Sequence, residues 1–230
     1  MRRIILFITI TLAAFAGTVN GAEKVTIQKP DFEAIRSAVT DRESDLYYPK
    51  LIEKFSSNDT VMTIDEYRHL YYGYMFSEDY DPYRRPEHNE SVDPLYFKNN
   101  HTKEECDTIM KYAELNLADN PFDLRQMMFF VIALKEKKKF ARASILQFKL
   151  NHLVAAILSS GDGSKDNPWY VISPMHEYNL LNFMNYVVEA YESVEDGVLD
   201  YLKIKKVNDK TPEGYYFNVE KVLEMYNKKF

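Results

Sequence analysis

Apolar side chains recur every three to four residues from about residue 30 to residue 160, the spacing that places them on one face of an α-helix. We predict a first helix opened by Pro30 and Asp31 and a short second helix beginning at Pro49, because proline suits the first helical turn. A long amphipathic helix should end near residue 159, with Gly161 as its C-terminal cap. Most of this region is therefore predicted to be helical.

A further helix is predicted where Thr63 and Glu66 have the Thr-x-x-Glu spacing of a capping box. Two stripes of large side chains follow at helical spacing, one made of Tyr67, Leu70, Tyr71 and Tyr74 and the other of Arg68, Tyr72 and Met75. Gly73 lies within this helix, where glycine costs about 1 kcal/mol relative to alanine, so we expect a neighbour to pack closely against it. Residues 77–86 contain two prolines and should form a structured loop that folds back on the helix.

The polar segment 87–101 is assigned to loop or short helix. After it, Thr102 and Glu105 repeat the capping-box spacing and should open a helix that continues through Leu117, with Cys106 on its inner face. The spacing of these residues predicts a second well-capped helix in this half of the chain.

The next helix should follow Pro121 and run over about residues 122–137, where it is apolar on most sides and is predicted to be the buried centre of the helical part. The stretch 116–143 resembles one tetratricopeptide-type helical hairpin. Because a solenoid needs about three repeats, we interpret the likeness as helical-hairpin packing and not as an array.

The pattern changes to period two beyond residue 163, and strands are predicted over residues 169–172, 186–194, 198–205 and 214–218. Asp196 and Gly197 separate the second strand from the third, and both central residues of the favoured hairpin turn adopt positive φ. A short helix is expected near residues 176–183, and Asn218 can cap a final helix.

These elements predict an α+β fold in a single domain over residues 22–230. A helical part, over about residues 30–160, should pack with a small C-terminal antiparallel sheet and a terminal helix over about residues 168–230.

The first 21 residues have the three-part layout of a secretory signal peptide. Arg2 and Arg3 precede an apolar run over residues 4–16, and small residues follow before an expected cleavage beside Ala22. The run is shorter than the roughly 20 residues that a membrane-spanning helix needs. We therefore expect a secreted, periplasmic protein that does not span a membrane.

Composition narrows the classes of partner. The chain of 230 residues is 46% hydrophobic and 28% charged, which is an ordinary globular balance. Its formal charge of -6 argues against binding to nucleic acid or anionic lipid, although it does not describe local patches. The single cysteine, Cys106, excludes an intramolecular disulfide and any cysteine-based zinc cluster, and its place on an inner helix face predicts an unreactive buried thiol.

The sequence contains no complete catalytic or cofactor motif. His176 and Glu177 form only the first half of the His-Glu-x-x-His zinc pattern, since Leu180 occupies the position of the second histidine. We interpret them as a helix-start pair that bonds backbone amides, and keep them as secondary site candidates. We expect no cofactor and no metal.

The candidate ligand-contacting or structural cluster lies between residues 63 and 88 and consists of Glu66, Arg68, His69, Tyr72, Glu78, Asp79, Asp81, Tyr83 and Arg84. Together with His88, its acidic and imidazole groups could form general acid/base pairs or a hard metal site. Its tyrosines could instead contact a peptide or a glycan. We favour a third interpretation, a structural brace in which tyrosine hydroxyls are bonded and arginines pair with carboxylates.

Three segments carry a family resemblance: MTIDEYRHLYYGYMFSEDYDPYR, HEYNLLNF and GYYFNV. Together they resemble the domain of unknown function 4919 family, which is found in secreted or envelope proteins of gut Bacteroidetes, and the likeness extends over nearly the whole mature chain. It implies a bacterial cell envelope. The family has no established activity, so the resemblance transfers no catalytic residue.

The leading functional hypothesis is a non-enzymatic binding or protein-interaction module with a protein, peptide or glycan partner. One alternative is a hydrolase that uses the acidic and histidine residues of the 63–88 stretch. Another is a structural component of the envelope.

Overall fold

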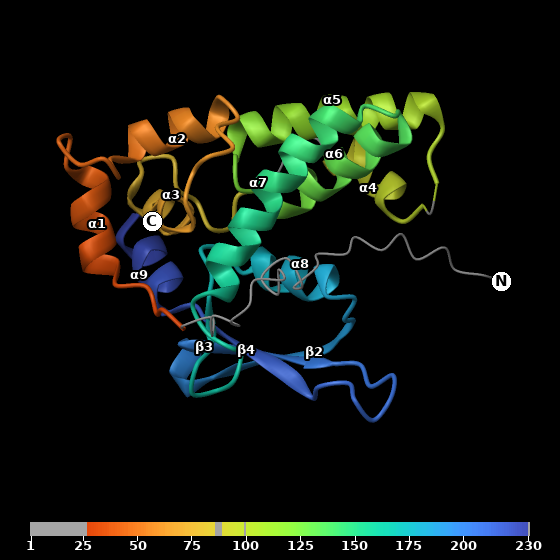
Figure 1. Ribbon diagram of the computed structural model, residues 1–230. Coiled ribbons are helices and arrows are strands. Elements are labelled where there is room, and N and C mark those ends of the chain that lie inside the picture. The colour runs from red at the N-terminus through yellow and green to blue at the C-terminus, as the bar shows by residue number, and fades with distance from the viewer. Residues whose placement is uncertain (1–26, 86–88, 99, 230) are drawn as a thin grey trace, which may run out of the picture.

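The computed structural model describes residues 27–85, 89–98 and 100–229, and it confirms the α+β class. A layer of helices lies over one face of a sheet, with α8 between the two (Figure 1). The helices are α1 (Phe32–Thr40), α2 (Tyr48–Ser56), α3 (Ile64–Gly73), α4 (Asn89–Tyr96), α5 (Lys103–Asp119), α6 (Leu124–Glu136), α7 (Phe140–Leu158), α8 (Met175–Phe183) and α9 (Glu220–Lys229). The strands are β1 (Trp169–Tyr170), β2 (Val188–Val194), β3 (Leu199–Ile204) and β4 (Gly214–Asn218).

Local side-chain bonds set the helix starts. Both predicted capping boxes are present, and in the first of them Glu66 N donates to Thr63 Oγ1 at 3.2 Å while Thr63 N donates to the Glu66 carboxylate at 2.7 Å. The start predicted for α6 is wrong by two residues. Asp123 caps α6 by accepting from Gln126 N at 3.0 Å, so the helix begins at Leu124.

The sheet has the order β1-β4-β3-β2. Strands β2, β3 and β4 are antiparallel neighbours as predicted, but β1 pairs with β4 in parallel, so the expectation of a wholly antiparallel sheet is wrong. The connection through α8 and the β2–β3 hairpin is long enough to return the chain in the direction of β1. Strand β1 ends at Tyr170, shorter than predicted.

The loop between β2 and β3 has positive φ at both predicted positions, 56° at Asp196 and 89° at Gly197. It is longer than the predicted two-residue turn, because Val194 pairs with Leu199, and Glu195 also adopts a positive φ of 53°. By contrast, Gly161 is not a left-handed cap, since Gly163 and Gly197 are the glycines with positive φ among the described residues. A Cβ at Gly161 would lie 2.3 Å from the Pro168 carbonyl oxygen, so the close return of the backbone is what excludes a side chain there.

Helix α3 is buried on both of its predicted stripes. Tyr67, Leu70, Tyr71, Tyr72 and Met75 have no exposed surface, because α1, α2 and α7 pack around the helix. Helix α6, which was predicted to be the buried centre, is less enclosed and keeps several half-exposed side chains. It lies between the main core and a smaller apolar cluster that it shares with α5. The buried centre is therefore α3.

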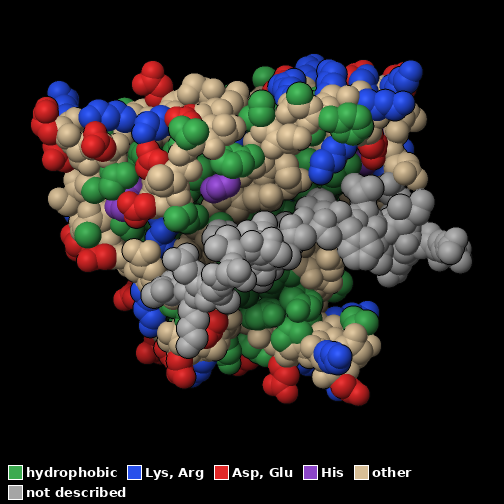
Figure 2. Space-filling model, in the orientation of Figure 1, with side chains coloured by type: hydrophobic (Ala, Val, Ile, Leu, Met, Phe, Trp, Pro, Cys, Tyr) green, Lys and Arg blue, Asp and Glu red, His purple; other side chains and the backbone are tan. Residues whose placement is uncertain are grey.

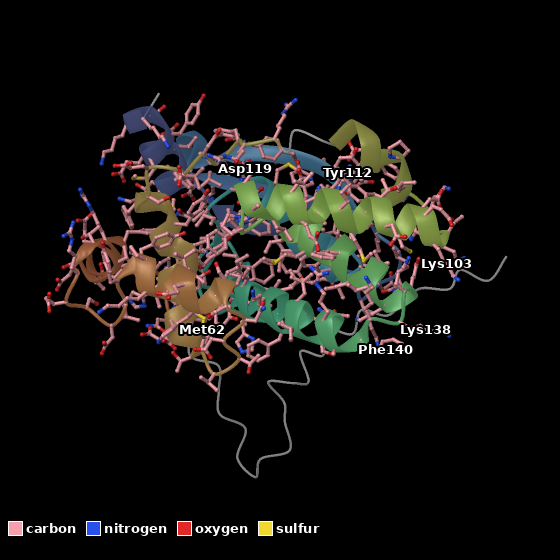
Figure 3. The ribbon with its side chains drawn as sticks, turned by 90° about the horizontal axis from the view of Figure 1, so that it is seen from above. Met62, Lys103, Tyr112, Asp119, Lys138 and Phe140 are labelled. Carbon is pink, nitrogen blue, oxygen red and sulfur yellow. The ribbon has the colours of Figure 1, made fainter. Side chains whose placement is uncertain are left out.

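Helices α5, α6 and α7 pack in succession, and Figure 3 shows them side by side from above. The tetratricopeptide likeness itself stays a prediction. Within the described ranges, no helix combines the length and apolar character needed to cross a membrane.

Gly73 has the close neighbour that the sequence predicts. A Cβ built on Gly73 would lie 2.8 Å from Val39 Cγ1, which is shorter than an ordinary van der Waals contact. Helix α1 therefore approaches α3 closely at this point. Valine is stiff at χ1, and its methyl group cannot turn away freely.

We expect Gly73→Ala to destabilise the protein by up to about 2 kcal/mol, because overpacking costs about 1 to 3 kcal/mol while alanine gains about 1 kcal/mol as the better helix former. Urea unfolding of the variant measures this. In a Val39→Ala background, which removes the clashing methyl groups, the same change should stabilise the protein by up to about 1 kcal/mol. An equal loss in both backgrounds would show that the Val39 contact is not the cause.

Candidate functional site

Two of the predicted site residues, Arg68 and Tyr72, point into the interior. The Arg68 guanidinium donates to the Gln28 carbonyl oxygen at 2.7 Å and to Ser159 Oγ. The Tyr72 hydroxyl donates to the backbone carbonyl of Ala156 at 3.3 Å, near the end of α7. Both side chains join α3 to other segments and are closed to a ligand.

Glu66 and His69 are bonded at the surface of α3. The Glu66 carboxylate, besides closing the capping box, accepts from Lys54 Nζ at 2.5 Å. His69 Nδ1 lies 2.9 Å from the Asp65 carbonyl oxygen, one helical turn back. Their partners are local, and the two side chains do not share a partner.

The loop after α3 is held by its own arginine. Arg84 donates to the Asp79 carbonyl oxygen at 2.7 Å and to Asp119 Oδ1 at 2.8 Å, while Asp81 Oδ1 accepts from Tyr83 N at 2.9 Å. Glu78 is exposed, and its backbone carbonyl accepts from Lys229. His88 lies outside the described residues. The structure thus divides the predicted cluster between the buried face of α3 and a tied loop.

The secondary candidates, His176 and Glu177, are buried in α8. His176 Nδ1 lies 2.7 Å from the Tyr71 hydroxyl, and burial lowers the pKa of His176 to about 4, so its imidazole is neutral near pH 7. Its other bond is to the backbone of Phe122. The interpretation of His176 as a partner of amides at its own helix start is therefore wrong.

Glu177 faces a second carboxyl group, that of Asp200 on β3. Glu177 has no exposed surface, and its carboxylate oxygens accept from no donor among the described residues. Burial raises the pKa of Glu177 well above its ordinary value, and the nearby Asp200 carboxyl group acts in the same direction. Burial also raises the pKa of Asp200. The raised pKa values favour a protonated Glu177 beside the Asp200 carboxyl group, so the two groups titrate as a pair.

Tyrosines surround this carboxyl pair. Tyr191 on β2 donates its hydroxyl to Asp200 Oδ1 at 2.8 Å. The pKa values of Tyr83, Tyr178 and Tyr191 are all raised, first by burial and then by interactions that include the negative charges of Glu177 and Asp200. The pair therefore lies where α8, β2, β3 and the loop after α3 meet.

Sequence reasoning singled out Glu177 and Tyr83 but missed Asp200, Tyr178 and Tyr191. A signal for Asp200 was present, because alternation along β3 puts it on the same face as the buried Leu202 and Ile204. An acidic residue at a core position of a strand requires a partner.

A shallow recess of about 430 Å³ opens in front of the pair, between α8 and β2. It is lined by Tyr178, Asn182, Val187, Val188, Glu189, Ala190 and Tyr191. Tyr191 is 53% exposed and Val187 is 59% exposed, so apolar surface faces solvent here. Tyr178 and Tyr191 line the recess and also interact with the carboxyl pair, Tyr191 through its hydrogen bond to Asp200.

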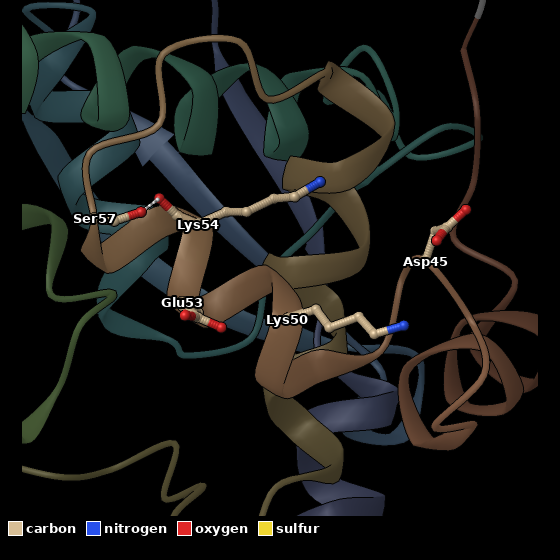
Figure 4. Close-up of a pocket in the computed structure, with 5 residues that line it drawn as sticks. All are labelled: Asp45, Lys50, Glu53, Lys54 and Ser57. Carbon is tan, nitrogen blue, oxygen red and sulfur yellow. Dashed lines mark hydrogen bonds between the residues drawn. The ribbon is translucent and has the colours of Figure 1, made fainter.

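A second recess of about 450 Å³ lies along α2 and is lined by Asp45, Lys50, Glu53, Lys54 and Ser57. Figure 4 shows the two lysine side chains extended and the five side chains diverging instead of meeting at one point. Lys54 is paired with Glu66, and Lys50 Nζ donates to the Ser44 carbonyl oxygen at 3.0 Å. Its cations are already bonded within the chain, so this recess offers less to a ligand.

Cys106 is confirmed as a buried thiol. Its Sγ lies 3.3 Å from a carboxylate oxygen of Glu136, and the same oxygen lies 3.1 Å from His101 Nδ1. Burial and then the Glu136 carboxylate raise the pKa of Cys106 to about 11, so the thiol stays protonated. The Glu136 carboxylate thus contacts both the thiol and the imidazole. A nucleophilic cysteine would instead need the imidazole next to its sulfur as a general base. In the described parts of the chain, no group of three or more His, Cys, Asp or Glu side chains is arranged to hold a metal ion.

Residues 33–228 match a family described as a domain of unknown function, DUF4919. No curated protein and no solved structure matches the chain.

The carboxyl pair predicts a pH-dependent stability. Because the folded-state pKa of Glu177 lies above the ordinary value of 4.5, the stability from its retained proton is complete below pH 4.5 and is lost as the pH rises through the folded-state pKa. The Glu177→Gln variant has an amide N–H that can donate to Asp200, and because this amide does not ionise, its contribution to stability is not lost as the pH rises. The difference in Tm between the variant and the wild type should be near zero at pH 4.5 and should grow to a few degrees by pH 8, where about 1 kcal/mol corresponds to roughly 2 to 4 °C.

The same substitution at the exposed Glu192 of β2 serves as the matched control and should give no such trend. His176, whose pKa is lowered, affects both proteins alike below pH 6.5 and cancels in the difference. A Tm difference for Glu177→Gln that does not vary with pH would show that Glu177 does not retain its proton in the folded state.

Proposed function

We propose that this chain, which belongs to the DUF4919 family, is a non-enzymatic binding protein whose ligand site is the recess between α8 and β2. The family description assigns no activity, so the argument rests on the chemistry of the recess. The single observation that carries it is the tyrosine pair of the recess, the half-buried Tyr178 and the exposed Tyr191, set beside polar side chains.

The lining of the recess suits a glycan. Tyrosine rings offer rigid apolar faces at low entropic cost, and the apolar faces of sugar rings can lie against them. Asn182 and Glu189 are exposed at the same recess. Asn182 supplies an amide for sugar hydroxyls, whereas the Glu189 carboxylate is paired with Lys203 at 2.9 Å and offers only its remaining acceptor capacity. An open, shallow site of this kind fits one part of a chain-like ligand better than a small molecule that must be enclosed.

Strand β2 favours a glycan over an extended peptide. It is an edge strand, and an edge strand can in principle accept a peptide as a further strand. However, the ladder is irregular between Val188 and Ala190, and Glu189 and Glu192 place charges along the edge. Bulges and charges are features that protect an edge from pairing.

The tyrosine of β2 is held in place before a ligand arrives. Its hydroxyl is bonded to Asp200, which is 6% exposed and lies near Glu177. A ring whose orientation is already set loses less entropy on binding. In this account the buried carboxyl pair positions Tyr191 and does not contact the ligand.

A hydrolase is the second candidate, and one observation favours it. Two neighbouring carboxyl groups with raised pKa values are the acid and base of many hydrolytic sites, and Glu177 and Asp200 are such a pair. Against it, both groups are buried, where a substrate does not reach them.

The proposal places the protein outside the cytoplasm. The basic, apolar and small-residue segments of residues 1–21 support export with cleavage beside Ala22, which N-terminal sequencing of the exported protein tests.

We expect Tyr178→Ala to weaken glycan binding at least tenfold, because it removes a ring face of the recess. The measurement is a glycan array followed by calorimetry on the strongest ligand. Tyr191→Phe should weaken binding less, since it keeps the ring and loses only the bond to Asp200.

Tyr216→Ala is the matched control. Tyr216 packs against Tyr201 at a centroid distance of 4.6 Å, next to the inward-facing Phe217 and hence on the opposite face of the sheet, and its loss should leave binding unchanged. Equal affinity for Tyr178→Ala and wild type would refute the assigned site. Release of a shortened glycan that Glu177→Gln abolishes would establish the hydrolase instead.

A further inference from the structure

One end of the helical layer carries a concentration of cations that the net charge conceals. We call it the basic tip, and it consists of Lys103, Lys135, Lys137, Lys138, Lys139 and Arg142. Figure 3 places Lys103, Lys138 and Phe140 at this end of the helices, and Figure 2 shows Lys and Arg side chains gathered over it at the upper right. The chain as a whole has a charge of -6.

The tight turn between α6 and α7 directs these lysines outward. Helix α6 ends at Glu136 and α7 begins at Phe140, so only three residues reverse the chain, and Lys138 takes the left-handed conformation with φ of 58°. Their backbone amides return to the last turn of α6, for example Lys139 N to the Leu134 carbonyl oxygen at 2.8 Å. The Lys138 and Lys139 side chains are exposed as a consequence.

The charges of the tip are only partly neutralised. Lys137 pairs with Asp107 at 2.8 Å, and Arg142 pairs with Glu114. Lys138 and Lys139 form no side-chain hydrogen bond or ion pair with any residue that the structure describes. The first turn of α7 contains no acidic side chain to offset them. Positive charge therefore remains available to an anionic partner.

An apolar side chain lies in the middle of these cations. Phe140 is 60% exposed, directly after Lys139 in the chain. A single exposed apolar residue needs no explanation by itself. An aromatic ring among lysines is nevertheless the combination found where a protein lies on a membrane surface, because the ring enters the headgroup boundary while the lysines face phosphates.

We propose that the basic tip docks the protein peripherally on an anionic lipid surface. Lys138 and Lys139 contact headgroup phosphates, and Phe140 enters the boundary between headgroups and acyl chains. A soluble polyanion would engage the lysines equally but would give no role to the exposed ring, which is why the ring favours a bilayer. The tip belongs to the helical layer and β2 to the sheet below it, so docking leaves the α8–β2 recess open (Figure 1).

The test is co-sedimentation with phosphatidylcholine vesicles that contain or lack phosphatidylglycerol, at low and high salt. The wild type and all variants are purified from cells in the same way, and circular dichroism checks that each variant is folded. We expect binding that requires phosphatidylglycerol and weakens with salt. Lys138→Glu with Lys139→Glu should lower the partition more than tenfold, since each lysine near such a surface contributes about fivefold. Phe140→Ser should lower it several-fold at both salt concentrations.

The control is Lys205→Glu with Lys206→Glu, a pair of exposed lysines next to the exposed Val207, which together resemble the tip in composition. This change should leave the partition unaltered. Equal binding to vesicles without phosphatidylglycerol, or equal losses in the two lysine double variants, would overturn the proposal. A third outcome would replace lipid docking with docking to a soluble polyanion. In it, the Lys138→Glu, Lys139→Glu variant loses vesicle binding, Phe140→Ser has no effect, and the wild type binds soluble polyphosphate as well as it binds the vesicles.

Discussion

The structure depends on burying tyrosine rings while giving most of their hydroxyl groups a hydrogen-bond partner; the buried Tyr67 hydroxyl is an exception among the described residues. A buried hydroxyl without a partner costs free energy of about 1 to 3 kcal/mol, so each ring in the core constrains where a backbone or side-chain partner must lie. The Tyr71 hydroxyl meets His176 and accepts from Ile172 N at 3.3 Å, and the Tyr80 hydroxyl donates to the Ile172 carbonyl oxygen at 2.7 Å. These bonds hold the segment around Ile172, which connects the helices to the sheet, against α3 and the loop that follows it.

The same requirement explains the arrangement of the possible sites. Because α3 and its loop use most of their polar groups for bonds within the chain, the part of the sequence with the densest candidate chemistry offers a ligand little. The surfaces that remain open are at the periphery. At β2 a tyrosine is oriented from behind by a buried carboxyl pair, and at the α6–α7 turn the chain reverses too tightly to hide its lysines.

Local rules predicted the parts of the fold that depend on neighbours in sequence. The capping box of Thr63 and Glu66 and the positive φ of Asp196 and Gly197 require only a few consecutive residues, and they are as expected. The parallel pairing of β1 with β4 depends on the path of the long connection between them, which periodicity does not encode. Full burial of α3 likewise depends on several other elements. Its two stripes were visible, but a tyrosine stripe can face solvent or core, and only tertiary packing decides.

The candidate site shows the same limit. Glu177 was visible as half of a familiar motif, whereas its partner Asp200 is 23 residues away and becomes adjacent only when β3 packs under α8. The net charge, which is a sum over the chain, could not reveal the basic tip, because lysines at one turn are outweighed by acidic residues elsewhere.

Helix α3 is the brace on which the remaining elements assemble. Native-state hydrogen exchange can test this role, because amides in the most stable unit exchange only through global unfolding. We expect the amides of residues 67–73 to be among the slowest in the protein and to share the free energy of global unfolding. Exchange of these amides through a lower-energy opening, while those of α5 and α6 stay protected, would contradict it.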